Sequence, residues 1–411
     1  MKNQGTGAVP SDLKIRNRMM VLDILKEGEA YTAADIAELT GISRPTVMKS
    51  IQHFIEKGLV ISGGKGTSTE SGGKKPELYS FACKQVLLTI ALWPNLFKIT
   101  LSHLNAKKIA TFEMVTPIQK TAVEAFALVA ERALGLLGEY GYETADLYGV
   151  SMSTAGIIDY EHGILKYSSM SPEWGNNIEI EKHLRTIFGE RVELIVENAG
   201  KMAGRAELTV ENIDEKRILV LFSTWGFSAC FIERGRVLNG QNSLIGEIGH
   251  MVIDPHDAER CGCGSYGCAE RLISKERICK MIKEQSEAYP GSSLLKIAEN
   301  GLTHELLFEH SAQGDILARE IVVYLAKVFA GVIRNISLSF DPDIVVFQGD
   351  YAAADCFFIE TLKEQLGNFR YYPKEGPFEL QFDKRSLEEL DFVGAVNFLQ
   401  HRFFKNELLY R

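Results

Sequence analysis

Three cysteines and one histidine are grouped in a glycine-rich stretch of the sequence. Cys261, Cys263 and Cys268 fall within eight residues, and His250 lies 11 residues before the first of them. The glycines between the cysteines permit a tight turn that brings the three sulfur atoms together. One imidazole and three thiolates suit Zn²⁺, and four protein ligands leave no position for an activated water. The stretch therefore predicts a structural zinc site rather than a catalytic one.

Two other interpretations of these residues stay open. His256 lies in the same stretch and could replace His250 as the fourth ligand. A disulfide pair with a spare thiol is the other alternative. The seven cysteines are an odd number and no secretory signal is recognisable, which favours a reducing, cytoplasmic location with free thiols.

Two glutamates flank the cysteine stretch. Glu247 precedes His250 by three residues, and Glu270 follows Cys268 by two. A metal that joins both ends of the stretch would hold the two carboxylates near each other, where they suit the vicinal hydroxyls of a sugar. Alternatively, each glutamate caps a helix or pairs with Arg260 or Arg271.

The sequence here reads Gly-Glu-x-Gly-His, a spacer and Cys-x-Cys-Gly-x-x-Gly-Cys-x-Glu. This pattern resembles the signature of the ROK family of sugar kinases and sugar-responsive repressors. The resemblance implies that His250 and the three cysteines bind zinc and that Glu247, Glu270 and His250 reach a sugar. It also implies that Asn198, in Val-Glu-Asn-Ala-Gly, belongs to the sugar side of the site.

The composition indicates a globular protein with an uneven charge distribution. Its 411 residues suggest two to three domains, and the longest largely apolar run, Val86 to Trp93, is too short to span a bilayer. We therefore expect no membrane insertion. The net charge is −9, yet residues 1–80 hold 11 basic and 9 acidic residues. A mildly basic head thus precedes an acidic body, which alone is weak evidence for nucleic-acid binding.

The head, residues 11–80, is predicted to be a winged helix-turn-helix domain. A first helix is expected to begin near Ser11-Asp12 and to end by Gly28. A second helix is expected from Thr32 to Gly41, with Ile36 and Leu39 facing inward. Ser43 is expected to cap a third helix. Two short strands around a basic tip would form the wing. The residues expected to contact duplex DNA are Ser43, Arg44, Pro45, Thr46, Lys49, Lys65, Lys74 and Lys75. A three-helix protein-interaction module is the alternative, and the wing argues against it.

The body alternates apolar strands with helical stretches, which predicts an α/β fold. Residues 86–104 and 218–237 both read as strand, turn, strand. The ROK resemblance implies a two-lobed, actin-like (ribonuclease-H-like) fold with the sugar between the lobes. We expect a first lobe at 84–198, completed by a C-terminal helix at 386–405, and a second at 199–385 with the zinc loop at 246–270. Trp174 either stacks on a sugar or simply packs in the core.

Phosphoryl transfer would require glycine turns for ATP phosphates, a carboxylate for Mg²⁺ and a catalytic base. In the first hairpin, where ROK kinases have Asp-x-Gly-Gly-Thr, this sequence has Ala91-Leu92-Trp93-Pro94-Asn95. In the second hairpin it has Thr224-Trp225-Gly226-Phe227-Ser228. Ala199 follows Asn198 at the position where the family has its aspartate base.

These losses favour a non-enzymatic, DNA-binding regulator of the repressor type over an active sugar kinase with a DNA-binding head or a pure interaction protein. Its expected partners are a sugar effector and an inverted-repeat operator, and its expected assembly is a homodimer or homotetramer.

Overall fold

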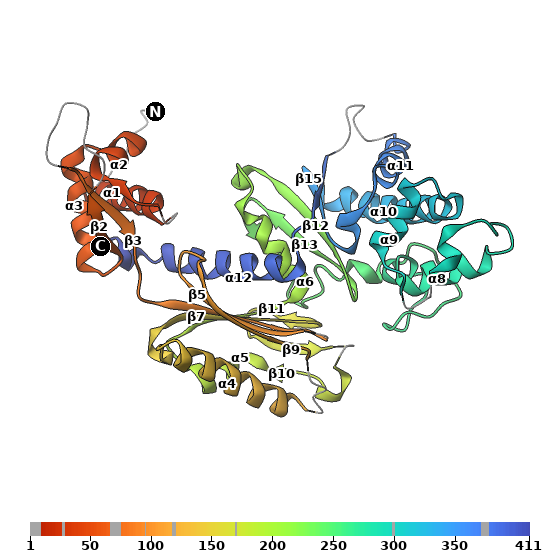
Figure 1. The fold of residues 1–411 in the computed structure, drawn as a ribbon, viewed down its shortest axis with the longest axis horizontal. Coiled ribbons are helices and arrows are strands. Elements are labelled where there is room, and N and C mark those ends of the chain that lie inside the picture. Colours follow the sequence, from red (N-terminus) through yellow and green to blue (C-terminus); the bar gives the residue numbers. More distant parts are fainter. Residues whose placement is uncertain are drawn as a thin grey trace, which may run out of the picture.

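The computed structural model describes residues 10–26, 29–65, 75–94, 96–116, 121–168, 171–297, 301–370 and 378–411. Figure 1 shows three regions: a head formed by the N-terminal residues, a first sheet below it, and a second sheet with most of the helices on the other side. Helix α12 (Leu387–Phe404) runs from the second sheet to the head.

The head is a winged helix-turn-helix domain, as predicted. It comprises α1 (Pro10–Leu25), α2 (Ala33–Thr40), α3 (Arg44–Glu56) and a sheet of order β1-β3-β2, built from β1 (Tyr31–Thr32), β2 (Val60–Lys65) and β3 (Glu77–Phe81). Helix α2 begins with a capping box between Thr32 and Asp35 and ends at Gly41, whose φ of 70° is left-handed. This glycine makes the turn between the two helices of the motif.

Some details of the head differ from the sequence prediction. Leu39 is 60% exposed, because α2 is short and buries only Ala33 and Ile36 fully. Ser43 stands at the N-cap of α3 but makes no side-chain bond to the helix backbone; its hydroxyl instead lies 2.9 Å from the Thr46 hydroxyl. The expected wing tip lies outside the described residues.

The first sheet has the strand order β11-β7-β4-β5-β6, and the second has the order β14-β13-β12-β15-β16. In each, an antiparallel hairpin (β4–β5 or β12–β13) continues through a third antiparallel strand on one side and two parallel strands on the other. The two sheets thus repeat one topology, as the repeated strand-turn-strand pattern predicted. The strands are β4 (Val86–Leu92), β5 (Phe97–His103), β6 (Lys108–Met114), β7 (Leu147–Thr154), β11 (Glu193–Asn198), β12 (Arg217–Ser223), β13 (Phe227–Glu233), β14 (Arg236–Val237), β15 (Ile344–Gly349) and β16 (Glu379–Asp383).

Helices bury the apolar faces of both sheets. The first sheet packs in one core with α4 (Ala122–Glu139) and α5 (Ile180–Phe188), and a small sheet of β8 (Ile157–Asp159), β9 (Ile164–Tyr167) and β10 (Ile178–Glu179) lies beside it. The second packs with α8 (Lys275–Glu284), α9 (His304–Ala312), α10 (Ile316–Phe340) and α11 (Cys356–Gly367). Helix α10, with 25 residues, is the longest helix in the described part of the chain.

Helix α12 connects the regions. It packs against β4 and β7 of the first sheet and against α6 (Ala199–Gly204), which follows β11. Its C-terminal end enters the same apolar core as the head: Leu399, Phe403 and Tyr410 cluster with Val21 and Phe54. The head is therefore packed onto the body rather than tethered by its linker alone. The domain boundaries given above remain predictions.

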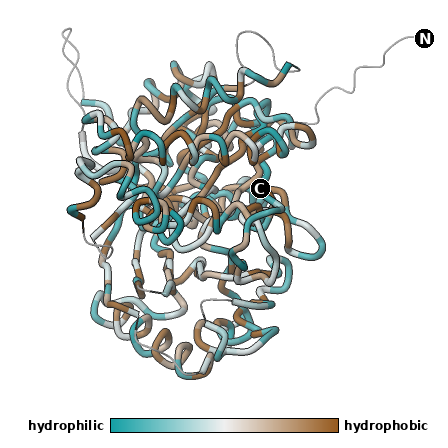
Figure 2. The backbone as a smooth tube through the Cα atoms, turned by 90° about the vertical axis from the view of Figure 1, so that its right-hand side faces the viewer, coloured by the Kyte–Doolittle hydropathy of each residue, from teal (hydrophilic) through white to brown (hydrophobic). Residues whose placement is uncertain are grey.

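Hydropathy alternates along the tube in Figure 2. Among the described residues, no helix is long and apolar enough to cross a membrane.

Candidate metal centre and ligand cavity

A compact loop holds the cysteine stretch together. His250 ends the single-turn helix η5 (Ile248–His250), and Cys268 immediately precedes α7 (Ala269–Leu272). A β-bridge between Val252 and Cys268 aligns the two ends. Gly267 has a φ of 68°, and a Cβ there would meet the Asp254 carbonyl oxygen at 1.8 Å. Only glycine fits that position, so it is part of how the loop closes.

The four predicted ligands form one cluster. The ligand atoms of His250, Cys261, Cys263 and Cys268 all lie within 4.8 Å of one another, whereas His256 is not part of the group. Cys263 Sγ lies 3.6 Å from Cys268 Sγ, and Cys261 Sγ lies 3.6 Å from His250 Nδ1. Ordinary zinc bond lengths imply tetrahedral edges of about 3.8 Å between two sulfurs and about 3.5 Å between sulfur and nitrogen. The cluster therefore fits a zinc ion, and all seven cysteines are free thiols.

The predicted sugar-side residues line one cavity next to this cluster. Asn198, Glu247, His250 and Glu270 all face a space of about 470 Å³, within the range typical of small-molecule sites. Their role in binding a ligand remains a prediction.

The two glutamates sit differently in the cavity wall. Glu270 Oε2 accepts a hydrogen bond from the Phe227 backbone N–H at 2.9 Å, which fixes the carboxylate against the second hairpin. The pKa of the Glu247 carboxyl is raised, because the effect of burial exceeds the opposing effect of the charges of His250 and Lys201. Arg271 pairs with Glu259 and Glu276 instead of Glu270, so the salt-bridge alternative for Glu270 is not what the structure shows.

Asn198 already has a structural role. Its Oδ1 accepts hydrogen bonds from the backbone of Gly200 and Lys201 and so caps α6, while its Nδ2 donates to the Gly156 carbonyl oxygen at 2.9 Å. These bonds hold the amide rigidly at the cavity edge and leave one N–H of Nδ2 for a ligand.

Of the two interpretations of Trp174, the structure supports packing, and it places another aromatic residue at the cavity. Trp174 packs against Phe126, with ring centroids 6.1 Å apart, and is not among the residues that line the cavity. Its structural interpretation is therefore the correct one. Tyr167, at the end of β9, does line the cavity. No motif marked it, because its position depends on how β8 and β9 fold against β11.

The two hairpin turns meet through their tryptophans. Trp93 is 2% exposed and its Nε1 donates to Ser153 Oγ at 3.0 Å. The Trp93 and Trp225 ring centroids are 5.4 Å apart, and Ala199 belongs to the same apolar cluster. Apolar side chains thus fill the space between the turns. The carboxylate nearest in sequence to Asn198 is Glu197, which is fully buried and paired with Arg205 at 2.9 Å.

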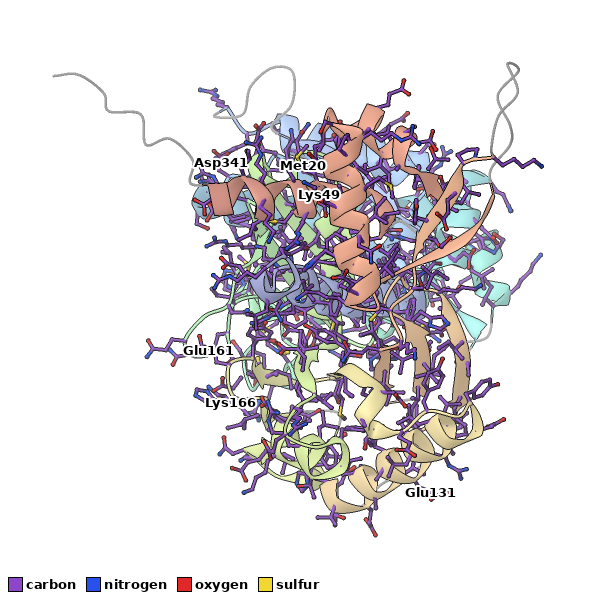
Figure 3. All side chains as sticks on the ribbon, turned by 90° about the vertical axis from the view of Figure 1, so that its left-hand side faces the viewer. Met20, Lys49, Glu131, Glu161, Lys166 and Asp341 are labelled. Atoms are coloured by element: carbon purple, nitrogen blue, oxygen red, sulfur yellow. The ribbon has the colours of Figure 1, made fainter. Side chains whose placement is uncertain are left out.

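The expected DNA-contacting residues are presented by the head. Ser43, Arg44, Pro45 and Lys49 are exposed on α3 or at its start, and Thr46 is half-buried. Figure 3 shows Lys49 on the outer face of the head. Lys75 is exposed just before β3, whereas Lys74 and the Lys65 side chain lie outside the described residues.

Comparison with known proteins decides the family. A model described as "ROK family" matches residues 97–397. The chain belongs to the ROK family. A second model, described as "MarR family", matches residues 11–66, the helix-turn-helix part of the head.

Relatives of this ROK protein include both regulators and kinases. It is 23% identical over 406 residues to the "DNA-binding transcriptional dual regulator NagC" of Escherichia coli, covering 97% of this chain and 95% of the other. It is 26% identical over 259 residues to the "Glucokinase" of Thermotoga maritima, covering 62% and 79%.

Solved structures show the same fold. A ROK family transcriptional regulator described as a homolog of the E. coli MLC protein superposes with a TM-score of 0.75 at 20% identity, covering 97% of this chain and 98% of the other. A ROK glucokinase from Streptomyces griseus gives a TM-score of 0.60 at 17% identity, covering 76% and 98%.

Proposed function

We propose that this ROK protein is a DNA-binding transcriptional regulator of the repressor type, acting on carbohydrate-use genes, whose operator affinity is set by a sugar or sugar derivative bound in the 470 Å³ cavity. The observation that carries the proposal is the apolar contact of Trp93, Trp225 and Ala199. It occupies the place where the family resemblance puts the phosphate turns and the base, while the adjoining cavity, which Trp225 and Ala199 also line, keeps Asn198 and the two glutamates.

The head supplies the DNA-reading part of the proposal. Arg44 is exposed in the first turn of α3, and Lys49 is exposed about one turn further along the helix. A recognition helix contacts the major groove through exposed residues near its N-terminal end. Relatives named as regulators match this chain over the head and body together. A homodimer or homotetramer would present two heads to an inverted-repeat operator, with half-sites about one helical turn or a multiple apart.

Zinc is proposed to act as a brace for the effector site. Because its ligands come from both sides of the loop, the ion would fix Glu247 and Glu270 relative to each other. The chain's own carboxylates would accept hydrogen bonds from sugar hydroxyls, and binding would shift the relative positions of the lobes that carry the heads. We expect the protein to act in a reducing compartment, the cytoplasm, where free thiols and a thiolate zinc site are stable.

An active sugar kinase with a DNA-binding head is the second candidate. It is favoured by the similarity to glucokinases, which extends over the body. It predicts sugar-dependent ADP release, whereas the regulator predicts none.

The test combines both candidates. Full-length protein is used to select duplexes from a random DNA pool at fixed salt, with and without each member of a sugar panel, and the same preparation is assayed for ADP release. We expect one enriched inverted repeat, a change of its affinity with at least one sugar, and no ADP. Absence of any enriched sequence, or steady ADP release with a hexose, would refute the proposal.

A further inference from the structure

A second, larger cavity lies where the head meets the body. It has a volume of about 840 Å³ and shares no lining residue with the cavity beside the cysteines. Its wall is built from α1 of the head, from α12, from the single-turn helix η3 (Arg205–Thr209) that follows α6, and from the hairpin that ends in β14.

The wall of this junction cavity is basic, although the chain as a whole carries a net charge of −9. Its charged lining residues are Lys26, Arg205, Arg236, Arg402 and Lys405 against Asp23 and Asp214. Three of these cations already have a carboxylate partner: Lys26 pairs with Asp23 at 2.7 Å, Arg205 with Glu197 at 2.9 Å and Arg402 with Glu193 at 3.6 Å. Within the described part of the chain, the side chains of Arg236 and Lys405 have no partner.

Two buried hydrogen-bond donors in the wall also lack acceptors. Arg205 is only 4% exposed, and its Nη2 donates to Glu197 Oε2 at 2.9 Å, but its Nε has no partner in the described residues. The Nδ2 of Asn397, on α12, is likewise buried and unpaired there. An unpaired buried donor costs about 1–3 kcal/mol. Both atoms have almost no exposed surface, so a ligand would reach them only after a small movement of the side chains that cover them.

Like charges are held close together around the cavity. The guanidinium carbons of Arg205 and Arg402 lie 5.1 and 5.4 Å from the centroid of the same ring, Phe398. Burial first, and then the charges of Lys405, Arg402 and Arg205, lower the pKa of the neighbouring His401. The cavity therefore has a positive potential that a bound anion would neutralise.

We propose that the junction cavity binds a small molecule that carries a phosphoryl group. Phosphoryl oxygens accept several hydrogen bonds and carry up to two charges, which matches the exposed, unpaired charges of Arg236 and Lys405 in the cavity wall. The volume exceeds what a phosphate ion alone would fill, and the polar lining favours a hydroxylated organic portion such as that of a phosphorylated sugar.

Ligand binding at this position would hold the head in place. A molecule in the cavity touches α1 of the head, α12 and the second lobe at once, so it binds best when these three keep the arrangement seen here. By linkage, the ligand stabilises this arrangement against those in which the head moves away. The cavity is thus a second input to the head, separate from the cavity beside the cysteines.

The test uses calorimetric titration of the full-length protein with glucose 6-phosphate, inorganic phosphate and glucose. The double variant Arg236→Gln/Lys405→Gln removes two exposed charges that have no partner in the described residues, so its fold and thermal midpoint should be unchanged. Lys363→Gln, an exposed lysine on α11, is the matched control. We expect glucose 6-phosphate to bind wild type and control equally and to bind the double variant at least tenfold more weakly.

The other results are equally decisive. Phosphate binding that is lost in the double variant supports the site. Equal affinity of glucose 6-phosphate for wild type and double variant places its site elsewhere and overturns the proposal. If no phosphate-bearing probe binds but the double variant binds duplex DNA more weakly, the basic wall serves the DNA backbone and the proposal is wrong.

Discussion

His53 Nε2, in the recognition helix, lies 2.9 Å from the backbone carbonyl oxygen of Leu409, two residues from the C-terminus. Lys57 Nζ donates to the Leu408 carbonyl oxygen at 2.6 Å, and Arg18 Nη1 donates to that of Tyr410 at 2.9 Å. Tyr410 is 2% exposed, and its ring centroid is 6.2 Å from that of Phe54. Residues 408–410 thus complete the apolar core of the head and join α3 to α12.

Tyr410→Ala should destabilise the head. Loss of a buried aromatic side chain costs about 3–5 kcal/mol, and the ring here packs directly on α3. Hydrogen exchange should show faster exchange in α1 and α3 with unchanged protection in β12 and β15. Leu408→Ala is the control, because Leu408 is 66% exposed. Unchanged exchange in α3 of the Tyr410 variant would show that the tail is dispensable for the head.

Cys263→Ser should remove most of the bound zinc. Serine lacks the thiolate that completes the four-ligand set, and structural zinc sites rarely survive the loss of one ligand. Metal content per chain is measured after dialysis against a metal-free buffer. Cys356→Ser is the matched control, since Cys356 is also exposed but lies outside the cluster. Equal zinc in both variants would contradict the assignment.

Asp391→Asn should change how stability depends on pH. Burial raises the pKa of Asp391 to about 7, against a smaller opposing effect of the Ser153 hydrogen bond. Between about pH 4 and pH 7 the Asp391 carboxyl is therefore protonated in the folded state but ionised in the unfolded state. This group's contribution to the free energy of unfolding is present at low pH and is lost as the pH rises towards 7.

The asparagine variant should lack this loss. Its free energy of unfolding, relative to wild type, should increase by roughly 2–4 kcal/mol between pH 4 and pH 8. Denaturant unfolding at several pH values measures the difference. A constant difference between the two proteins over that range would exclude a buried, neutral carboxyl at position 391.

Ala199→Asp should not restore sugar phosphorylation. The introduced carboxylate could act as a base, but Trp93 and Trp225 still fill the space between the hairpin turns. A coupled ADP assay over the sugar panel should remain at background for the single variant. Turnover by this variant would show that the tryptophans do not block the nucleotide and that only the base is missing.

Arg44→Ala should weaken binding to the selected operator by about 1–3 kcal/mol, which corresponds to roughly 5–150-fold, if Arg44 contacts a base edge. Loss of discrimination at one operator position should accompany it. Fluorescence anisotropy at fixed salt measures both effects, with Lys363→Ala as a control for charge loss on a remote helix. An equal effect of both variants would indicate only a general electrostatic contribution.

Local sequence determined much of this protein. The Thr32–Asp35 capping box and Gly41 fix the helix-turn-helix because these contacts lie within a few residues of one another. The same holds for the cysteine loop, where close spacing and Gly267 bring three sulfurs together. The strand-turn-strand pattern predicted an α/β body with two similar passages, and the family resemblance supplied the two-lobed architecture.

Tertiary structure decided what depends on distant segments. Leu39 is apolar but exposed, and Trp174 packs on Phe126 instead of lining the cavity, because burial is set by neighbours that periodicity does not specify. The contact between Trp93 and Trp225 joins two hairpins that lie far apart in the sequence. The docking of Tyr410 joins opposite ends of the chain, and the junction cavity combines both ends with residues 205–237 from the middle, so both arise only when α12 reaches the head.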